Sequence, residues 1–325
     1  MNFEGFLPVR VRWTEEGPRV QWTEFGNQRL LAPFFEDDIG TQMREPFHQL
    51  FRRETSMDEL LAWVESRPSL PLAGSVLHVS RCGSTLISQM LAAVPHHVVA
   101  SEPAPLDQIL RARFYLPDLP RETHLRWIRG MMAALAQPRV GGEDRFFLKP
   151  DCWHLNELDL LRDAFPDMPL LMLYREPLEV MVSHDRAAAA WAVPGMLHPS
   201  ALRLEQGAWK PDAREVYSAR ALAGFYEGGL IAAQQHGAML VNFNELPAAM
   251  FSRISRHFDL RLEDMPVMLE QSLRNAKTPG MPFVADSEEK RNSARDAVRE
   301  ATETYLRDVY LRLEEARNAQ LVRGF

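Results

Sequence analysis

Residues 76–94, VLHVSRCGSTLISQMLAAV, constrain the fold most, because they predict a buried strand, a tight polar turn and a helix in direct succession. The opening residues are mostly apolar, as in a buried strand, and the apolar residues from Leu86 to Val94 recur at helical spacing until Pro95. The turn SRCGST contributes a glycine, small hydroxyls and one cation. Free N–H groups and the positive end of the helix dipole favour a phosphate or sulfate there. The stretch therefore predicts an anion-binding loop in an α/β fold.

The ligand that this loop predicts is a nucleotide, but the loop lacks the usual ATP- or GTP-binding motif. The Walker pattern GxxxxGK[ST] requires glycine at position 78 and lysine at position 84, where this chain has His78 and Ser84. An ordinary ATP or GTP site is therefore disfavoured. A turn that merely links a strand to a helix remains an alternative for this segment taken alone.

Length and charge limit the classes of protein to which the chain can belong. A chain of 325 residues allows about two domains, or one α/β domain with an extension. Its 46% hydrophobic and 25% charged residues are typical of a globular protein. The formal net charge of −7 argues against non-specific nucleic-acid binding, which needs a basic face. Any anion site must therefore be a local concentration of positive charge.

The two cysteines, Cys82 and Cys152, are too few for a disulfide framework, which favours a reducing compartment. No His, Cys and carboxylate set has ligand spacing, so no metal is expected. The N-terminal residues lack a signal-peptide core, and no apolar run approaches the roughly 18 residues of a membrane span. The sequence thus predicts a cytoplasmic protein without a membrane segment.

The first 70 residues predict a small α+β extension. Alternating apolar residues over 8–25, with a turn at Gly17-Pro18, indicate a hairpin, and a helix is expected over about 41–52. Ser56 and Glu59 form a capping-box start for a second helix. A packing role is preferred for this extension, with a substrate-binding cap as the alternative.

Residues 71–325 predict one α/β domain with a parallel sheet flanked by helices, in which strands and helices alternate. Strands are expected at 76–79, 98–100, 146–149 and 170–174, and helices at 86–94, 105–137, 155–165, from Pro177 onward and at about 288–317. The Trp-, Pro- and Gly-rich segment 191–211 fits a lid over an acceptor and an irregular surface loop equally well.

Charged residues follow three of these strands, and ligands of open α/β sheets bind at the carboxyl ends of strands. Glu102 fits either a general base or a helix-capping glutamate, and Lys149 fits either a cleft charge or a solvated strand end. Arg175, with Ser183 two turns into the next helix, can hold one phosphate from two sides. The adjacent 184–186 cluster, His-Asp-Arg, is expected on a solvated helix face.

Two of these segments together resemble a known family. The loop Val79–Leu86, VSRCGSTL, and the segment Leu173–Pro177, LYREP, followed by Ser183, are similar to the two phosphosulfate-binding motifs of sulfotransferases that use 3′-phosphoadenosine 5′-phosphosulfate (PAPS). The resemblance covers about residues 75–260. It implies a P-loop-type fold whose first loop holds the 5′-phosphosulfate without a Walker lysine, while the second motif holds the 3′-phosphate.

The resemblance also implies residue roles. Arg81 stands where many cytosolic members have lysine, as in the tyrosylprotein and bacterial branches, and Glu102 falls where the tyrosylprotein branch has its catalytic base. Lys149 matches a strand-end lysine that acts on the transferring group. The segment Lys277–Gly280 is the best substitute for the family's C-terminal cofactor loop. The cofactor-binding residues implied in this way are Arg81, Cys82, Gly83, Ser84, Thr85, Arg175, Ser183 and Lys277.

The expected function is transfer of a sulfuryl group from PAPS to a hydroxyl or amine of a small-molecule or peptide acceptor, with PAP as the product. Glu102, Lys149 and Arg81 are the expected catalytic residues. A P-loop-type small-molecule kinase and a non-catalytic nucleotide-binding module are the alternatives. The motifs indicate neither the acceptor nor the oligomeric state.

Overall fold

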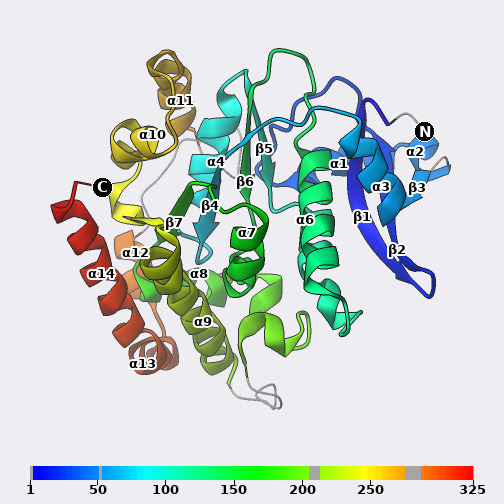
Figure 1. Cartoon of the computed structure of the whole chain (residues 1–325). Helices are drawn as coiled ribbons and strands as arrows, with labels where there is room; N and C mark the ends of the chain where they lie inside the picture. The colour runs from blue at the N-terminus through cyan, green and yellow to red at the C-terminus, as the bar shows by residue number, and fades with distance from the viewer. Residues whose placement is uncertain (1–2, 51–52, 205–212, 275–286, 325) are drawn as a thin grey trace.

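A five-stranded parallel sheet forms the centre of the protein (Figure 1). The computed structural model describes residues 3–50, 53–204, 213–274 and 287–324. The strand order is β5-β6-β4-β7-β8, and every neighbouring pair is parallel. The strands are β4 (Leu72–His78), β5 (His97–Ser101), β6 (Arg145–Lys149), β7 (Leu170–Tyr174) and β8 (Met239–Asn242). The expected α/β fold with a parallel sheet flanked by helices is confirmed.

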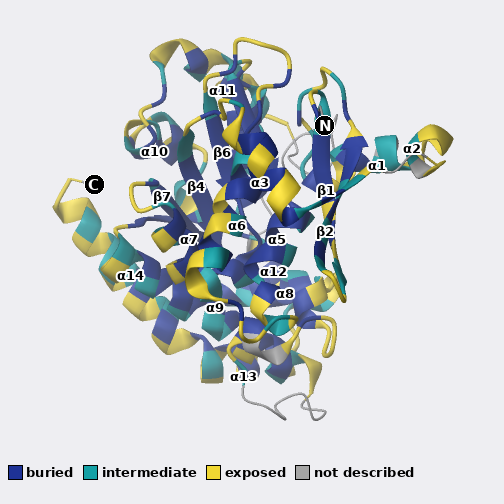
Figure 2. Ribbon diagram, turned by 45° about the vertical axis from the view of Figure 1, so that its right-hand side comes forward, coloured by how far each residue is buried: buried dark blue, intermediate teal, exposed yellow. Residues whose placement is uncertain are grey.

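Burial explains why these segments form strands. All five residues of β5 and all five of β7 are buried, which is the near-continuous apolar pattern of a parallel sheet covered on both faces. Figure 2 shows the same concentration of buried residues along the sheet, with exposed residues on outer helices such as α14 (Arg307–Val322). The strand that precedes the anion-binding loop, β4, is the middle strand, so the loop emerges at the centre of the sheet edge.

Helices alternate with these strands and pack against them. They are α4 (Ser84–Ala93), α5 (Ala104–Leu110), α6 (Arg121–Leu135), α7 (Leu158–Ala164), α8 (Pro177–Arg186), α9 (Arg214–His236), α10 (Arg253–His257) and α11 (Met265–Ser272). Helix α4 packs on β4, β5 and β6, and α9 packs on β4 and β7. A Cβ at Gly229 of α9 would lie 2.3 Å from Cε of Met172 on β7, so glycine there permits the close approach of helix and sheet.

The N-terminal residues form a second, antiparallel sheet of β1 (Phe6–Thr14), β2 (Gly17–Glu24) and β3 (Arg53–Ser56). The predicted hairpin is confirmed, but its turn is at residues 15–16, because Gly17 and Pro18 already pair with Thr14 and Trp13. Two short helices, α1 (Phe35–Arg44) and α2 (Pro46–Leu50), replace the single expected helix, which Pro46 interrupts. The capping box is confirmed at the start of α3 (Met57–Glu65).

Two long predicted helices are wrong in extent. The segment 105–137 divides into α5, the 3₁₀ turn η1 (Ala112–Phe114) and α6, because two prolines, Pro117 and Pro120, lie between the helical parts. The segment 288–317 divides into α12 (Ser287–Ser293), α13 (Asp296–Tyr305) and α14. Helix α13 packs on α8 and α9, whereas α14 packs on α9 and β8, so the break lets the chain follow two surfaces.

The two sheets share one apolar core. Leu7, Val9 and Val11 of β1 belong to the same buried cluster as the strands of the parallel sheet, and β1 packs on α5 and α6. The backbone N–H of Val11 also donates to Oε1 of Gln108 on α5 at 2.5 Å. None of the helices that the structure describes is both long enough and apolar enough to cross a membrane.

Candidate active site

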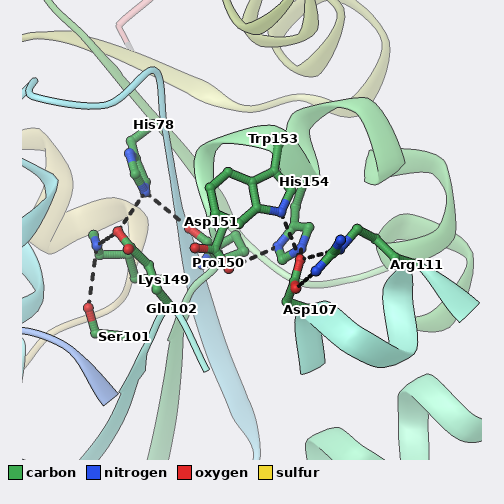
Figure 3. A network of polar contacts seen from close by, with 10 residues as sticks. All are labelled: His78, Ser101, Glu102, Asp107, Arg111, Lys149, Pro150, Asp151, Trp153 and His154. Atoms are coloured by element: carbon green, nitrogen blue, oxygen red, sulfur yellow. Dashed lines mark hydrogen bonds and ion pairs between the residues drawn. The ribbon is translucent and has the colours of Figure 1, made fainter. Parts of the chain in front are cut away.

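The charged residues that the sequence singles out lie at one edge of the parallel sheet. The anion-binding loop follows β4, Glu102 follows β5, Lys149 ends β6 and Arg175 follows β7. Ser101 and Lys149 are paired across β5 and β6, which brings Glu102 beside the lysine. Figure 3 shows these two side chains pointing toward each other. Residues that follow or end four strands, β4, β5, β6 and β7, are therefore placed at the same edge of the sheet.

The loop after β4 has the backbone geometry of an anion cradle. The φ angles of Ser80, Arg81 and Gly83 are 79°, 50° and 87°, in the left-handed region that non-glycine residues rarely adopt. Such strain persists only where the surrounding structure holds it, and it concentrates at functional sites. Within the described residues, the N–H groups of Arg81, Cys82 and Gly83 have no hydrogen-bond acceptor. These donors precede the N-terminus of α4, as an anion nest requires.

Buried contacts hold this loop in place. The Cys82 thiol donates to the Leu173 carbonyl on β7 at 3.2 Å, and burial raises the pKa of this thiol to about 11. The thiol is therefore an anchor rather than a nucleophile. A Cβ at Gly83 would lie 2.7 Å from Cδ1 of Leu246, so glycine is required there by both space and backbone conformation.

Glu102, Lys149 and His78 form a connected polar cluster. Nζ of Lys149 donates to the Glu102 carboxylate and, at 3.4 Å, to the Ser101 hydroxyl. The Lys149 side chain is 1% exposed and that of Glu102 is 24% exposed, so only the carboxylate reaches solvent. Nε2 of His78 lies 3.4 Å from Oε1 of Glu102 and 3.1 Å from the Pro150 carbonyl. The φ angle of Glu102, 56°, is also left-handed.

The hydrogen bonds of His78 define its tautomer. The Ser80 N–H donates to Nδ1 of His78 at 3.1 Å, so Nδ1 carries a lone pair and Nε2 carries the proton. Burial, together with the positive charge of Lys149, lowers the pKa of His78. A neutral His78 therefore joins the loop after β4 to the segment after β6.

The charge state of Glu102 follows from two opposing effects. Burial by itself raises the pKa of the carboxyl group, but the Lys149 ammonium and the His78 hydrogen bond outweigh it and hold the pKa below its ordinary value. Glu102 is therefore ionised at neutral pH. The lysine that stabilises this carboxylate also reduces its strength as a base.

A second buried cluster supports the segment that follows Lys149 (Figure 3). Asp107 accepts hydrogen bonds from Nε2 of His154 at 2.8 Å, from Nε1 of Trp153 at 2.7 Å and from Arg111. Burial, with the negative charges of Glu102 and Asp107, raises the pKa of Asp151. Because Asp107 accepts hydrogen bonds from three side chains, it holds the 3₁₀ helix η2 (Cys152–Glu157) against α5. Helix η2 follows Lys149 closely in the chain, so this contact supports the position of the lysine.

Arg175 lies next to the loop after β4. Its Nη1 is 3.5 Å from the Arg81 carbonyl, and its guanidinium carbon lies 4.0 Å from the ring centroid of Phe243. Its Nε donates to Glu179 at 2.6 Å, and the side chain is 5% exposed. Ser183 is half-buried on α8, the helix that follows Arg175 and also carries Glu179.

A sequence model described as "Sulfotransferase family" matches residues 76–264, more than half of the chain. The protein is a member of the sulfotransferase family. The matched region begins in β4 and includes the loop, Glu102, Lys149, Arg175 and Ser183. No curated protein sequence matches this sulfotransferase significantly.

Solved structures similar to this sulfotransferase include three bacterial proteins. The sulfotransferase STF9 from Mycobacterium avium is 15% identical over 75% of this chain and 78% of its own, with a TM-score of 0.42. The sulfotransferase domain of the olefin synthase from Synechococcus PCC 7002 is 14% identical over 74% and 96%, with a TM-score of 0.42. The sulfotransferase STF1 from Mycobacterium tuberculosis H37Rv is 15% identical over 77% and 81%, with a TM-score of 0.41.

The expectation of a solvated face at residues 184–186 is wrong for His184 of this sulfotransferase. This histidine is 2% exposed, its Nε2 lies 3.1 Å from the Ser80 hydroxyl, and its ring packs on Trp191. Asp185 pairs with Arg295 as a partly exposed residue should. Because His184 and Ser80 lie far apart in the sequence, only the packing of α8 beside the loop brings them together.

The N-terminal extension of the sulfotransferase also lies at this edge, whereas the sequence analysis preferred a packing role for it and kept a substrate-binding cap as the alternative. The ring of Phe34 lies 5.0 Å from Nζ of Lys149, and the Ser101 hydroxyl donates to the Pro33 carbonyl at 2.9 Å. Nε2 of Gln89 on α4 donates to the Leu31 and Ala32 carbonyls at 3.1 and 2.9 Å. Residues 31–34 thus form a wall beside the lysine.

Lys277, with the segment up to Gly280, lies outside the described residues, as do positions 205–212 of the expected lid segment. Both stay predictions. The described part of the lid segment begins at Trp191, which is 1% exposed and also contacts Phe225. Its beginning is therefore anchored in the core.

Proposed function

We propose that this sulfotransferase transfers a sulfuryl group from PAPS to a hydroxyl or amine of a small-molecule or peptide acceptor. The observation that carries the proposal is the loop after β4. Two non-glycine residues and one glycine there have positive φ, and three consecutive N–H groups have no acceptor among the described residues. Such a loop binds a multiply charged anion, and the nearby cations suit both ends of PAPS.

The residues present fit the two anionic ends of PAPS. Arg81, Cys82, Gly83, Ser84 and Thr85 would hold the 5′-phosphosulfate through N–H groups, hydroxyls and one guanidinium. Arg175 and Ser183 would hold the 3′-phosphate, and Lys277 is a further candidate for the same cofactor. When bound, PAPS supplies an activated sulfuryl group.

Glu102 and Lys149 would divide the chemistry between them. Glu102 would take the proton of the acceptor hydroxyl or amine, and Lys149 and Arg81 would stabilise negative charge on the transferring and leaving groups. A second anion beside Lys149 would share its positive charge, which raises the pKa of Glu102 toward that of a useful base. The ion pair of Lys149 with Glu102 would thus hold the base ionised until the site is filled.

Calorimetric binding of PAP tests the cofactor without knowledge of the acceptor. We expect micromolar binding to the wild type and at least tenfold weaker binding to Arg175→Ala. Arg121→Ala is the control, because Arg121 of α6 also pairs with a carboxylate, that of Asp163, but does not contact the loop or the Asp107 cluster. The control should bind PAP as the wild type does.

The same titration distinguishes the alternatives. Absence of PAP binding, with preference for ATP and magnesium, would contradict the proposal and favour a small-molecule kinase. PAP binding that Arg175→Ala leaves unchanged would remove Arg175 from the site. PAP binding without sulfation of any acceptor in a broad pool would favour a non-catalytic nucleotide-binding module.

A further inference from the structure

Three side chains at the opposite end of β5 have buried ligand atoms without hydrogen bonds. Nε2 of His96, Nε2 of His97 and Oδ2 of Asp264 are each buried and have no hydrogen-bond partner. One ligand atom from each of the three residues lies within 4.8 Å of the ligand atoms of the other two. An unpaired buried polar atom typically costs about 1–3 kcal/mol, so three at one place call for a common partner.

His97 is already oriented as a metal ligand. Its side chain is 2% exposed, and its Nδ1 lies 3.1 Å from the Leu91 carbonyl. A carbonyl only accepts, so Nδ1 carries the proton and Nε2 presents its lone pair to the cluster. Metal-binding histidines usually donate their second ring nitrogen to a carbonyl or carboxylate in this way.

The spacing of His96 and Asp264 also suits a cation. Nε2 of His96 lies 3.2 Å from Oδ2 of Asp264, although the two do not form a hydrogen bond. Ligands at about 2.0–2.1 Å from a tetrahedral zinc ion lie roughly 3.3–3.4 Å apart. The side chain of His96 is 17% exposed, which leaves a route for an ion and a water molecule.

The charges around the cluster do not oppose a cation directly. Arg145 donates to the carbonyls of Phe258 and Asp259, and Arg261 pairs with Asp144. The other His and carboxylate cluster, at Asp107, differs because Asp107 already accepts three donors, one of them the Arg111 guanidinium. Among the described residues, the cluster at His97 is thus the better cation site.

We propose that His96, His97 and Asp264 bind one Zn²⁺ ion, with water completing the coordination. Two imidazole nitrogens and one carboxylate oxygen are ligands that Zn²⁺ accepts. His97 begins β5 and Asp264 ends the 3₁₀ turn η7 (Leu262–Asp264), which leads into α11. Helix α11 packs on α4, so the ion would fasten α11 to the start of β5, beside the helix that follows the loop after β4.

This place is separate from the proposed catalytic edge. Four residue steps of β5 span roughly 13 Å at about 3.3 Å per residue, and they separate His97 from Ser101, beside which Glu102 stands. The ion would therefore stabilise the fold and leave the reacting groups unchanged. Sequence spacing missed the site because Asp264 comes from a distant part of the chain.

Titration of the full chain with Zn²⁺ tests the proposal. Protein stripped with a chelator and dialysed should bind one Zn²⁺ with micromolar or tighter affinity, and its thermal midpoint should rise. His96→Gln and Asp264→Asn should each weaken binding at least about tenfold, since loss of even a group that supports a ligand costs 10–100-fold.

His236→Gln is the matched control. Nε2 of His236 lies 3.3 Å from Oδ1 of Asp159 and its side chain is 15% exposed, but no second histidine joins this pair among the described residues. The control should bind Zn²⁺ as the wild type does.

A Co²⁺ titration of the wild type gives a readout that does not depend on any variant folding. Visible absorption that saturates at one Co²⁺ per chain, and that Zn²⁺ displaces, would support the site. Absence of such absorption, absence of Zn²⁺ binding, or binding that survives both substitutions would overturn it and leave His96 and Asp264 as an ordinary ion pair.

Discussion

Glu102 combines strain, partial exposure and an ion pair, and this combination explains why it is the candidate base. Its backbone is left-handed, and its carboxylate contacts both Lys149 and His78. A glutamate that merely capped α5 would have no need of this geometry, since the N-cap residue of α5 is Pro103. The structure therefore argues against a helix-capping Glu102 and against a solvated Lys149, whose side chain is 1% exposed.

Glu102→Gln should lower the turnover number by at least about 100-fold, because a positioned base contributes roughly 10²–10⁴-fold. PAP affinity should change less than threefold, since the amide keeps the shape of the carboxylate. Glu143→Gln is the control, because Glu143 is buried and hydrogen-bonded just before β6, at the opposite end of that strand from Lys149. Near-wild-type turnover of Glu102→Gln would contradict the assignment as base.

The lowered pKa of Glu102 gives this variant a stability signature as well. A carboxylate with a depressed pKa stabilises the folded state above its ordinary value of 4.5, and the contribution is lost as the pH falls through the folded value. In unfolding titrations, the difference in stability between wild type and Glu102→Gln should therefore shrink as the pH falls below 4.5. A constant difference over that range would show that the ion pair with Lys149 does not hold the carboxyl group ionised.

The elements around the candidate site come from the α/β domain and from the N-terminal extension. Segment 31–34 of the N-terminal extension is tied to α4 by Gln89 and to β5 by Ser101, and Asp38 of α1 accepts the N–H groups of Leu31 and Ala32. Its Phe34 ring lies near Lys149. The packing role expected for the extension is therefore incomplete, because part of it forms a wall of the candidate site.

Gln89→Ala should loosen this wall by removing two hydrogen bonds to its carbonyls, each worth about 1 kcal/mol. We expect faster amide exchange in residues 31–34 and a severalfold drop in turnover, because the ring beside Lys149 loses its support. Ser56→Ala is the control: it removes the capping box of α3, costs about 1 kcal/mol of stability and should leave turnover unchanged. An equal loss of turnover in both variants would mean that stability, and not the wall, limits activity.

The whole molecule is held together by one core that crosses the boundary between the extension and the α/β domain. The buried side chains of β1 pack on α5 and α6, and Arg139 donates to the Phe6 carbonyl at 3.3 Å. Burying a side chain such as Leu7 or Val11 contributes about 1.5–3 kcal/mol. Several such residues together are comparable with the roughly 5–15 kcal/mol by which a domain is usually stable.

A chain truncated to residues 71–325 should therefore aggregate or unfold without a cooperative transition. Thermal unfolding followed by circular dichroism, together with size-exclusion chromatography, measures this against the full chain. If the truncated chain melts cooperatively and binds PAP as the full chain does, residues 1–70 are an independent extension, as the proposed division at residue 70 would allow.

Local patterns predicted four strands of the parallel sheet because each contains a short apolar run that leads to a polar residue, although β4 begins at Leu72, before the expected Val76. The prediction of helix lengths was poorer. Prolines divided the segment 105–137, whereas the segment 288–317 divided because its two halves pack on different neighbours. Helical periodicity shows which face of a helix is apolar. It carries little information on where the helix must end or bend so that this face stays in contact with the rest of the core.

The sequence by itself determined the parallel α/β fold, the strand, turn and helix of residues 76–94, the family and the order of Glu102, Lys149 and Arg175 at strand ends. These features are local, since spacing within a few residues sets strand, turn and helix. Only the tertiary structure decided that His78 joins Glu102, that His184 faces Ser80, that Phe34 lies beside Lys149 and that Asp264 meets His96 and His97. Each of these contacts joins residues that approach one another only because of how the helices and sheets pack. No local sequence pattern encodes the distance between two residues that are far apart in the chain.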